Sequence, residues 1–237
     1  MTRRRWIADE FSGNQASLLG EHAQHLVRVL RVRVGEEFDI ATGVSVRRGR
    51  VTRVTDQRVE FDLEDEVPSR QIPNITLLLA IFKFDRMEWA IEKCTELGVA
   101  RFIPVIATRT DVHLVSAASK RVERWERIAR QASEQSRRSA APELRQPVKL
   151  KEAVKLTAPL RIVLSESERQ VTLKNALASR PSEGELWLAV GPEGGWTEDE
   201  LVLFSQAGWI PASLGNTILR AETTAIASTA IVVSELT

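Results

Sequence analysis

The chain has 237 residues, of which 43% are hydrophobic and 27% are charged, and its formal net charge is +1. These proportions are typical of a globular protein with a buried core and exclude a disordered chain. The sequence contains no run of about 18 apolar residues, which excludes a membrane-spanning helix, and its basic start lacks the apolar stretch of a secretory signal. One cysteine and three histidines argue against a disulfide framework and a zinc cluster. We therefore expect a cytoplasmic protein that needs no metal and no membrane.

The small net charge conceals large regional differences. Residues 120–151 hold ten lysines and arginines against four glutamates, and residues 1–58 hold eleven arginines against seven acids. Residues 152–237 are acidic, with six bases against eleven acids. Two basic regions beside an acidic one indicate a polyanion that binds to part of the protein. A merely solvated basic face is the alternative, and charge alone does not distinguish RNA, DNA and an acidic protein.

The first 70 residues predict short β-strands around one helix. The expected strands are 34–40, 44–46, 49–54 and 58–63, with a turn at Thr42-Gly43. The last two alternate between apolar and polar residues, as half-buried antiparallel strands do. Residues 20–31 carry apolar side chains at helical spacing and predict the helix. Several short strands close most readily into a small barrel, and the acidic, proline-containing stretch 64–73 predicts a linker after it.

From residue 75 onward, expected strands and helices alternate, which predicts an α/β domain with a mainly parallel sheet. Residues 75–82 form a continuous apolar run, as in a strand that is covered on both faces. The other expected strands are 101–105, 161–164, 186–190 and 210–214. The expected helices are 85–97, the basic segment 120–136, 197–208 and a final one from 221.

Capping residues predict where these helices begin and end. Asp85 with Glu88, and Thr197 with Glu200, have the spacing of capping boxes, so each pair predicts a helix start. Gly98 predicts the end of the helix that starts at Asp85.

Three loops follow expected strands and are candidates for chemistry. They are 165–168, the Gly-Pro-Glu-Gly-Gly segment 191–195, and 214–224. In parallel α/β sheets, ligands bind at the carboxyl ends of the strands, and glycines let a ligand approach the backbone closely. For the glycine-rich segment alone, a tight strand-to-helix connection is the alternative.

The common nucleotide-binding and hydrolase motifs are absent from the sequence. It contains no G-x-G-x-x-G after a strand, no P-loop, no G-x-S-x-G and no H-E-x-x-H. Their absence argues against a Rossmann dehydrogenase, a P-loop ATPase, the common Rossmann-type methyltransferase and the hydrolases that use these motifs.

The three loops and the basic segment together resemble the RsmE family, the bacterial small-subunit ribosomal RNA uridine N3-methyltransferases of the SPOUT superfamily. The resemblance is carried by residues 188–197, 214–224, 86–99 and 124–143, and residues 22–35 resemble the family's N-terminal module. These motifs occur in order over nearly the whole chain, which makes the set far more specific than any one motif. Thr42 and Ala221 depart from the family pattern, the first in a turn and the second beside the expected site.

The resemblance implies a fold, a cofactor and partners. It implies a PUA-like RNA-binding β-barrel at 1–70 and, at 74–237, a SPOUT-type α/β domain whose parallel sheet contains a trefoil knot. A homodimer, S-adenosylmethionine as the cofactor and 16S rRNA of the small ribosomal subunit as the partner are also implied. Knots are nearly absent from proteins in general, so periodicity could not have predicted one.

The resemblance also assigns residues to the site. The cofactor would lie against 164–166, 191–195 and 214–220, with contacts from Leu164, Ser165, Glu166, Gly191, Pro192, Glu193, Gly194, Gly195, Leu214, Gly215, Ile218, Leu219 and Arg220. Contacts with RNA are expected from Arg4, Arg28, Arg31, Arg137 and Arg138. For the last two, solvated charge at the end of a helix is the alternative.

Methyl transfer to N3 of a uridine requires that this imide nitrogen lose its proton. We expect Arg220 to stabilise the negative charge on the uracil oxygens, with anchoring of a loop as its alternative role. Glu222 is the expected proton acceptor and Glu193 the alternative, although a glutamate at a helix start is often a cap or dipole partner.

Two other functions remain open at this point. The same chemistry could act on another rRNA site or on tRNA, because target choice would depend on the barrel and the basic helix. Alternatively, the chain could be a non-catalytic RNA-binding factor in ribosome assembly that has kept the fold.

Overall fold

The computed structural model describes residues 5–68, 74–178 and 184–236, and the chain forms two compact units. The first unit comprises Met1–Gln71 with Ser133–Ala141, and the second comprises Ile72–Ala132 with Pro142–Thr237. The segment 133–141 groups with the first unit, a feature absent from the domain ranges expected at 1–70 and 74–237. In the described ranges, no helix is both long and apolar enough to cross a membrane.

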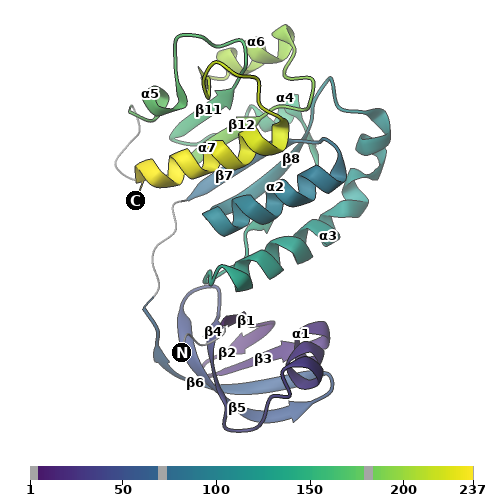
Figure 1. The fold of residues 1–237 in the computed structure, drawn as a ribbon, viewed down its shortest axis with the longest axis vertical. Helices are drawn as coiled ribbons and strands as arrows, with labels where there is room; N and C mark the ends of the chain where they lie inside the picture. The colour runs from purple at the N-terminus through teal and green to yellow at the C-terminus, as the bar shows by residue number, and fades with distance from the viewer. Residues whose placement is uncertain (1–4, 69–73, 179–183, 237) are drawn as a thin grey trace. The chain divides into compact units, whose positions relative to one another are not determined.

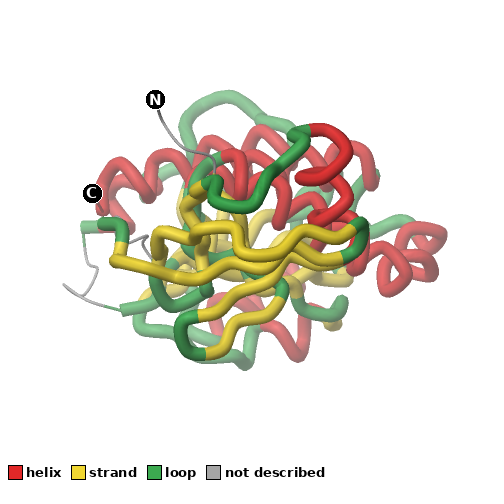
Figure 2. The backbone as a smooth tube through the Cα atoms, turned by 90° about the horizontal axis from the view of Figure 1, so that it is seen from below, coloured by secondary structure: helices red, strands yellow, loops and turns green. Residues whose placement is uncertain are grey.

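The first unit is built on a curled, mixed six-stranded sheet (Figures 1 and 2). Its strands are β1 (Arg5–Ile7), β2 (Glu10–Ser12), β3 (Gln15–Leu19), β4 (Glu37–Ala41), β5 (Val46–Thr55) and β6 (Arg58–Glu66), in the order β1-β4-β5-β6-β3-β2. Only the β1–β4 pair is parallel. Alternate side chains of β5 and β6, such as Val51, Val59 and Phe61, point into a core with Leu18 and Ile40.

Two sequence predictions for the first unit are wrong in detail. The expected strand 44–46 is reduced to Val46, which begins β5 together with 49–54, and Gly49 lets this strand pass directly over Ile40, where a β-carbon would collide. The expected linker starts too early, since Glu64–Glu66 continue β6 through pairing with β5.

The helix expected at 20–31 is a short α-helix followed by a wider turn. It consists of α1 (Gly20–Gln24) and the π-helix η1 (His25–Val29). The backbone N–H of Leu30 donates to the carbonyl of His25, five residues earlier, which is the π pattern. Arg31 then takes a left-handed conformation with φ of 53°, which ends the helix.

The second unit contains a seven-stranded sheet in which every strand pair is parallel. Its strands are β7 (Ile75–Ala80), β8 (Val99–Ile106), β9 (Glu143–Leu144), β10 (Val148–Lys149), β11 (Leu160–Leu164), β12 (Leu186–Val190) and β13 (Ile210–Ala212). The order is β10-β8-β7-β12-β11-β13, with β9 also beside β8. Every residue of β7 is buried, which confirms the prediction that this strand is covered on both faces, and every residue of β12 is buried as well.

Helices cover both faces of this sheet (Figure 1). They are α2 (Phe84–Leu97), α3 (Val112–Gln135), α4 (Leu150–Ala153), α5 (Leu173–Leu177), α6 (Glu198–Gln206) and α7 (Ala221–Leu236). One hydrophobic core joins the sheet to α2, α3, α5 and α7, and a second joins it to α4 and α6. The second core is rich in aromatic rings, with Trp187, Trp196, Phe204 and Trp209 in mutual contact. The predicted α/β class with a parallel sheet is therefore confirmed.

The helix ends show which capping predictions hold. Thr197 and Glu200 form the predicted capping box at the start of α6, and Gly98, with φ of 114°, ends α2. The capping box predicted at Asp85 and Glu88 is wrong, because α2 begins at Phe84 without a side-chain cap. Glu88 instead accepts hydrogen bonds from Arg124 on α3.

The basic helix α3 begins eight residues earlier than predicted, at Val112 rather than Lys120. Its start is favoured by Asp111, whose carboxylate accepts a hydrogen bond from the backbone N–H of His113 at 2.8 Å. Apolar side chains of α3 pack into the core, with Trp125 fully buried. The final predicted strand, 210–214, ends two residues earlier, at Ala212.

Candidate active site

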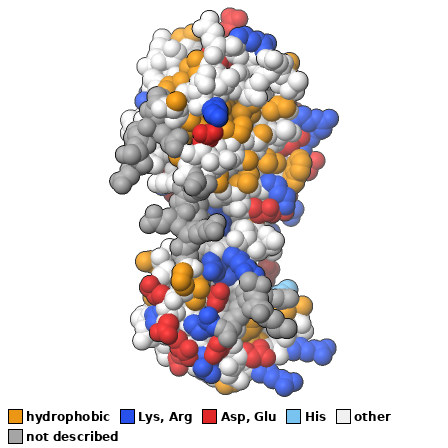
Figure 3. All heavy atoms as spheres, turned by 60° about the vertical axis from the view of Figure 1, so that its left-hand side comes forward, with side chains coloured by type: hydrophobic (Ala, Val, Ile, Leu, Met, Phe, Trp, Pro, Cys, Tyr) orange, Lys and Arg blue, Asp and Glu red, His pale blue; other side chains and the backbone are white. Residues whose placement is uncertain are grey.

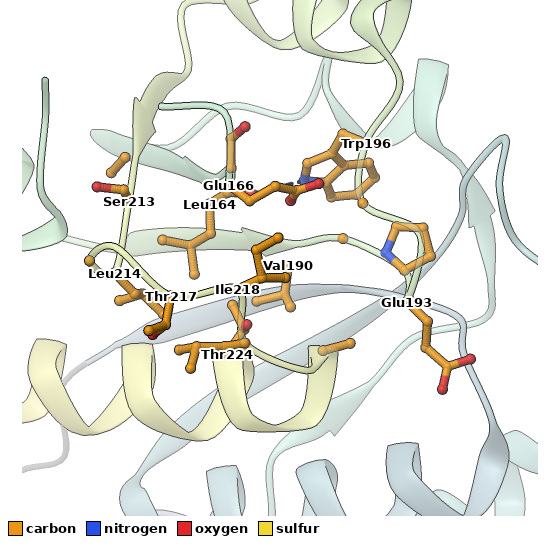
Figure 4. Close-up of a pocket in the computed structure, with 18 residues that line it drawn as sticks. Leu164, Glu166, Val190, Glu193, Trp196, Ser213, Leu214, Thr217, Ile218 and Thr224 are labelled. Carbon is orange, nitrogen blue, oxygen red and sulfur yellow. Dashed lines mark hydrogen bonds between the residues drawn. The ribbon is translucent and has the colours of Figure 1, made fainter. Parts of the chain in front are cut away.

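A pocket lies where β11, β12 and β13 end, and it is built from the three loops that follow these strands (Figure 4). Counted out to its open mouth, it holds about 620 Å³. Parallel pairing explains why the loops meet, because the carboxyl ends of these strands lie at one edge of the sheet.

Most residues assigned to the cofactor line this pocket. They are Leu164, Ser165, Glu166, Gly191, Pro192, Glu193, Gly195, Leu214, Gly215, Ile218 and Leu219. Two assigned residues, Gly194 and Arg220, do not line it. Seven residues without an individual assignment also line it: Val190, Trp196, Ala212, Ser213, Thr217, Ala221 and Thr224. Trp196 and Thr224 stand within the motifs that carry the family resemblance, and this was the signal that could have found them.

The glycine-rich loop after β12 needs its glycines for close packing. Gly195 has φ of 69°, and a β-carbon there would collide with the carboxylate of Glu166. Figure 4 shows the Glu166 side chain extending across the pocket toward Trp196. The indole N–H of Trp196 donates to the carbonyl of Leu164 at 3.2 Å, so the loop after β12 is tied to the end of β11.

Arg109, which follows β8, also holds this loop. Its guanidinium donates to the carbonyl of Gly194 and, at 3.5 Å, to that of Trp196. No local sequence pattern links residue 109 to this loop, so the contact is visible only in the tertiary structure.

A second arginine, Arg86 in the first turn of α2, contacts two glutamates of the site. It donates to Glu193 at 2.9 Å and lies 3.8 Å from Glu222. Glu222, at the start of α7, is 3% exposed and does not line the pocket. Its position counts against the expected role as proton acceptor. The carboxylate of Glu193 points away from Glu166 and Trp196 (Figure 4).

Arg220 stands directly before α7, between the pocket residues Leu219 and Ala221. Its side chain is exposed, and no partner for its guanidinium occurs among the residues that the structure describes. Within the described chain, the charge of Arg220 is therefore not neutralised by a neighbouring carboxylate.

The arginines expected to contact RNA differ in exposure. Arg28, Arg31 and Arg137 are exposed, and Arg137 has φ of 60° and a carbonyl that accepts a hydrogen bond from Arg5. Arg138 is only 6% exposed, and burial lowers its pKa to about 10. It remains charged at neutral pH but offers little surface to a phosphate, contrary to the expectation. Arg4 lies outside the described residues.

The described part of the chain contains no group of three or more histidine, cysteine, aspartate or glutamate side chains that could hold a metal ion. His22 contacts Asp9 at 3.1 Å, and His25 packs against the ring of Trp6. Cys94 lies on the buried face of α2, and burial raises its thiol pKa to about 12.

Comparison with known proteins identifies the class of protein that has this pocket. The family model described as RNA methyltransferase domain matches residues 69–233, which include every residue that lines the pocket. The chain belongs to this family of RNA methyltransferases.

Individual relatives narrow the class. Ribosomal RNA small subunit methyltransferase E of Synechocystis sp. is 34% identical over 84% of this chain and 66% of its own length. The Bacillus subtilis protein of the same name is 30% identical over 87% of this chain and 85% of its own length. The RsmE resemblance carried by the sequence motifs is thereby confirmed.

Solved structures agree with this result. The crystal structure of ribosomal RNA small subunit methyltransferase E from Neisseria gonorrhoeae, bound to S-adenosylmethionine, is 30% identical with a TM-score of 0.86. The structural match covers 99% of this chain and 98% of the Neisseria gonorrhoeae chain. A Legionella pneumophila methyltransferase with the same bound cofactor is also 30% identical, with a TM-score of 0.85 and the same coverage.

Proposed function

We propose that this protein transfers a methyl group from S-adenosylmethionine to N3 of a uridine in the 16S rRNA of the small ribosomal subunit. The pocket formed by the three loops after β11, β12 and β13 is the observation that carries the proposal. It is supported by relatives named small subunit methyltransferase E and by the cofactor bound to similar proteins.

The residues of the pocket fit S-adenosylmethionine, which has an apolar adenine face, polar ribose hydroxyls and a charged amino-acid part. Apolar side chains of Leu164, Val190 and Leu214 would contact the adenine, and the Glu166 carboxylate would accept hydrogen bonds from hydroxyls. Gly195 leaves room for a ligand where a side chain would strike Glu166. When bound, the cofactor supplies an electrophilic methyl group on its sulfonium.

The chain's own residues would position the uridine and stabilise charge. A uridine N3 becomes a good nucleophile only when its proton leaves, so negative charge develops on the uracil oxygens. Arg220, exposed at the rim of the pocket, would stabilise that charge. Glu222 and Glu193 remain the candidate proton acceptors, although their contacts with Arg86 favour a supporting role for both.

The RNA would bind through exposed arginines of the first unit. Arg28 in the π-helix and Arg31 shortly after it are exposed, and so is Arg33, for which no role was expected from the sequence. None of the three contacts a carboxylate in the described part of the chain, so their charges are available to phosphates.

The proposal includes the finer architecture of the family: a PUA-like barrel in the first unit, a trefoil knot in the second, and a homodimer in the cytoplasm. The curled mixed sheet supports the barrel. Hydrophobic side chains gather on one face of the second unit (Figure 3), and large apolar residues such as Trp89, which is 50% exposed, support a protein interface.

Two measurements on one preparation test the proposal. Isothermal titration with S-adenosylmethionine should show binding, and radiolabelled methyl transfer to unmodified 30S subunits should place the label on N3 of a uridine. Binding without transfer to the subunit would move the target to another rRNA or to tRNA. Absence of cofactor binding would contradict the proposal and favour a non-catalytic assembly factor.

A further inference from the structure

We propose that Arg86 is a positioning residue that holds two walls of the cofactor pocket together through Glu193 and Glu222. The inference rests on the proposed function for the identity of the ligand, but the contacts themselves belong to the described structure. Arg86 does not line the pocket and would act on the cofactor only through the two glutamates.

The two glutamates belong to different walls. Glu193 lies in the glycine-rich loop after β12, and Glu222 begins α7 directly after the loop that follows β13. Arg86 comes from a third element, the first turn of α2, and its Nη1 and Nε atoms face one glutamate each, at 2.9 Å and 3.8 Å. A single guanidinium therefore connects walls that are 29 residues apart in the chain.

The burial of Glu222 makes this connection important. Its side chain is 4% exposed, and its Oε2 atom has no hydrogen-bond partner among the described residues. Within those residues, Arg86 is the only basic side chain within 4.0 Å of it. A buried carboxylate that loses its counter-charge is strongly disfavoured, so the start of α7 should shift when Arg86 is replaced.

Arg109 cannot take over this role. It holds the glycine-rich loop through the carbonyls of Gly194 and Trp196, but it has no contact with α7. Replacement of Arg86 should therefore loosen one wall against the other while the loop stays attached to the sheet. The expected result is a weakened site in a folded protein.

The chain provides a control in a second arginine–glutamate contact, one that also involves α2. Arg124 of α3 binds Glu88 of α2 through two hydrogen bonds, at 2.7 and 2.8 Å, and neither residue lines the pocket. Arg124→Met thus removes an arginine–glutamate contact outside the pocket, and Glu88 keeps Arg121 at 3.6 Å as a second basic neighbour.

Two quantities are measured in each variant: amide hydrogen exchange of the unliganded protein and affinity for S-adenosylmethionine. The variants are Arg86→Met, Arg86→Lys, Glu193→Gln, the double variant Arg86→Met/Glu193→Gln, and the control Arg124→Met. In Arg86→Met, exchange should rise at 192–196 and 221–225, and affinity should fall about tenfold. Arg86→Lys should recover part of the affinity. The double variant should bind S-adenosylmethionine no more weakly than Arg86→Met does, because both substitutions break the same contact between Arg86 and Glu193.

Equal exchange in Arg86→Met and Arg124→Met at these segments would overturn the inference. So would additive losses in the double variant, since they would show that Glu193 and Arg86 act separately. If Arg86→Met does not fold, the isosteric Glu193→Gln decides by the same exchange measurement. A wild-type protein that binds no S-adenosylmethionine would refute the proposed function, whereas the exchange comparison would still decide the role of Arg86.

Discussion

Individual arginines of this protein differ sharply in what they contact. On β5 and β6, Arg50 and Arg58 are engaged by carboxylates, whose hydrogen bonds raise their pKa. Arg86 and Arg109 hold the walls of the pocket. Arg28 is exposed without such contacts in the described chain. Residue type alone therefore does not identify which arginines can bind a polyanion. The side chains that each arginine already contacts identify them.

Gly195 is the residue at which backbone conformation and the site meet most directly. Gly195→Ala would force a side chain into a left-handed conformation and against the carboxylate of Glu166. We expect the affinity for S-adenosylmethionine to fall by about tenfold or more, as judged by isothermal titration. Gly43→Ala is the matched control, because Gly43 has φ of 86° but open space around its α-carbon. Equal affinities for the two variants would contradict the placement of the cofactor against Gly195.

Cys94 is the chain's only cysteine, so its chemistry can be followed without interference. Burial raises its thiol pKa from 9.0 to about 12, and its neighbour Thr229 donates a hydrogen bond to the sulfur. Because the unfolded thiol ionises near 9.0 and the folded one only near 12, the free energy of unfolding should fall as the pH rises between these values. A thiol reagent at pH 8 should react only after denaturant is added, and rapid reaction in native buffer would contradict the burial.

At the scale of single elements, local rules hold where no distant side chain competes. The capping box at Thr197 and Glu200 forms as its spacing predicts, and Glu200 also accepts a hydrogen bond from the backbone of Thr108. The box predicted at Asp85 and Glu88 does not form, because α2 begins at Phe84 and Asp85 lies inside its first turn, while Glu88 accepts hydrogen bonds from Arg124.

The cap of α6 makes a stability prediction. Thr197→Ala removes the hydroxyl that accepts from the backbone N–H of Glu200, and we expect a loss of about 1 kcal/mol in the free energy of unfolding. Glu198→Gln, an exposed change in the same first turn, should alter stability by less than about 0.5 kcal/mol. Thermal or denaturant unfolding measures both, and equal effects would show that the cap contributes nothing.

At the scale of the whole molecule, the two units have different tasks in the proposed function. The second unit carries the pocket, and the first carries exposed arginines that suit phosphates. Binding that depends on phosphate contacts weakens steeply as salt is added, whereas binding in a small-molecule pocket depends on salt far less. The affinity for RNA should therefore fall steeply with added salt while the affinity for the cofactor changes little, and a variant that removes a phosphate contact should affect only the first.

Arg28→Gln tests this division of work. It should weaken RNA binding across the salt range, lower the dependence of log affinity on log salt by about one, and leave the affinity for S-adenosylmethionine unchanged. Arg50→Gln is the control, because Arg50 already binds Glu37 and Glu64. Titration of a small-subunit rRNA fragment by fluorescence anisotropy measures the effect, and an unchanged salt dependence in Arg28→Gln would exclude a phosphate contact there.

The sequence by itself determined the parallel α/β class, the three loops of the pocket and the family. It could do so because continuous apolar runs such as 75–82 mark central strands, and because the carboxyl ends of parallel strands must meet at one edge. Only the tertiary structure decided the contacts of Arg86 and Arg109, the burial of Arg138 and the failure of the Asp85 cap. Each of these depends on residues distant in the chain, whose encounter no local spacing encodes.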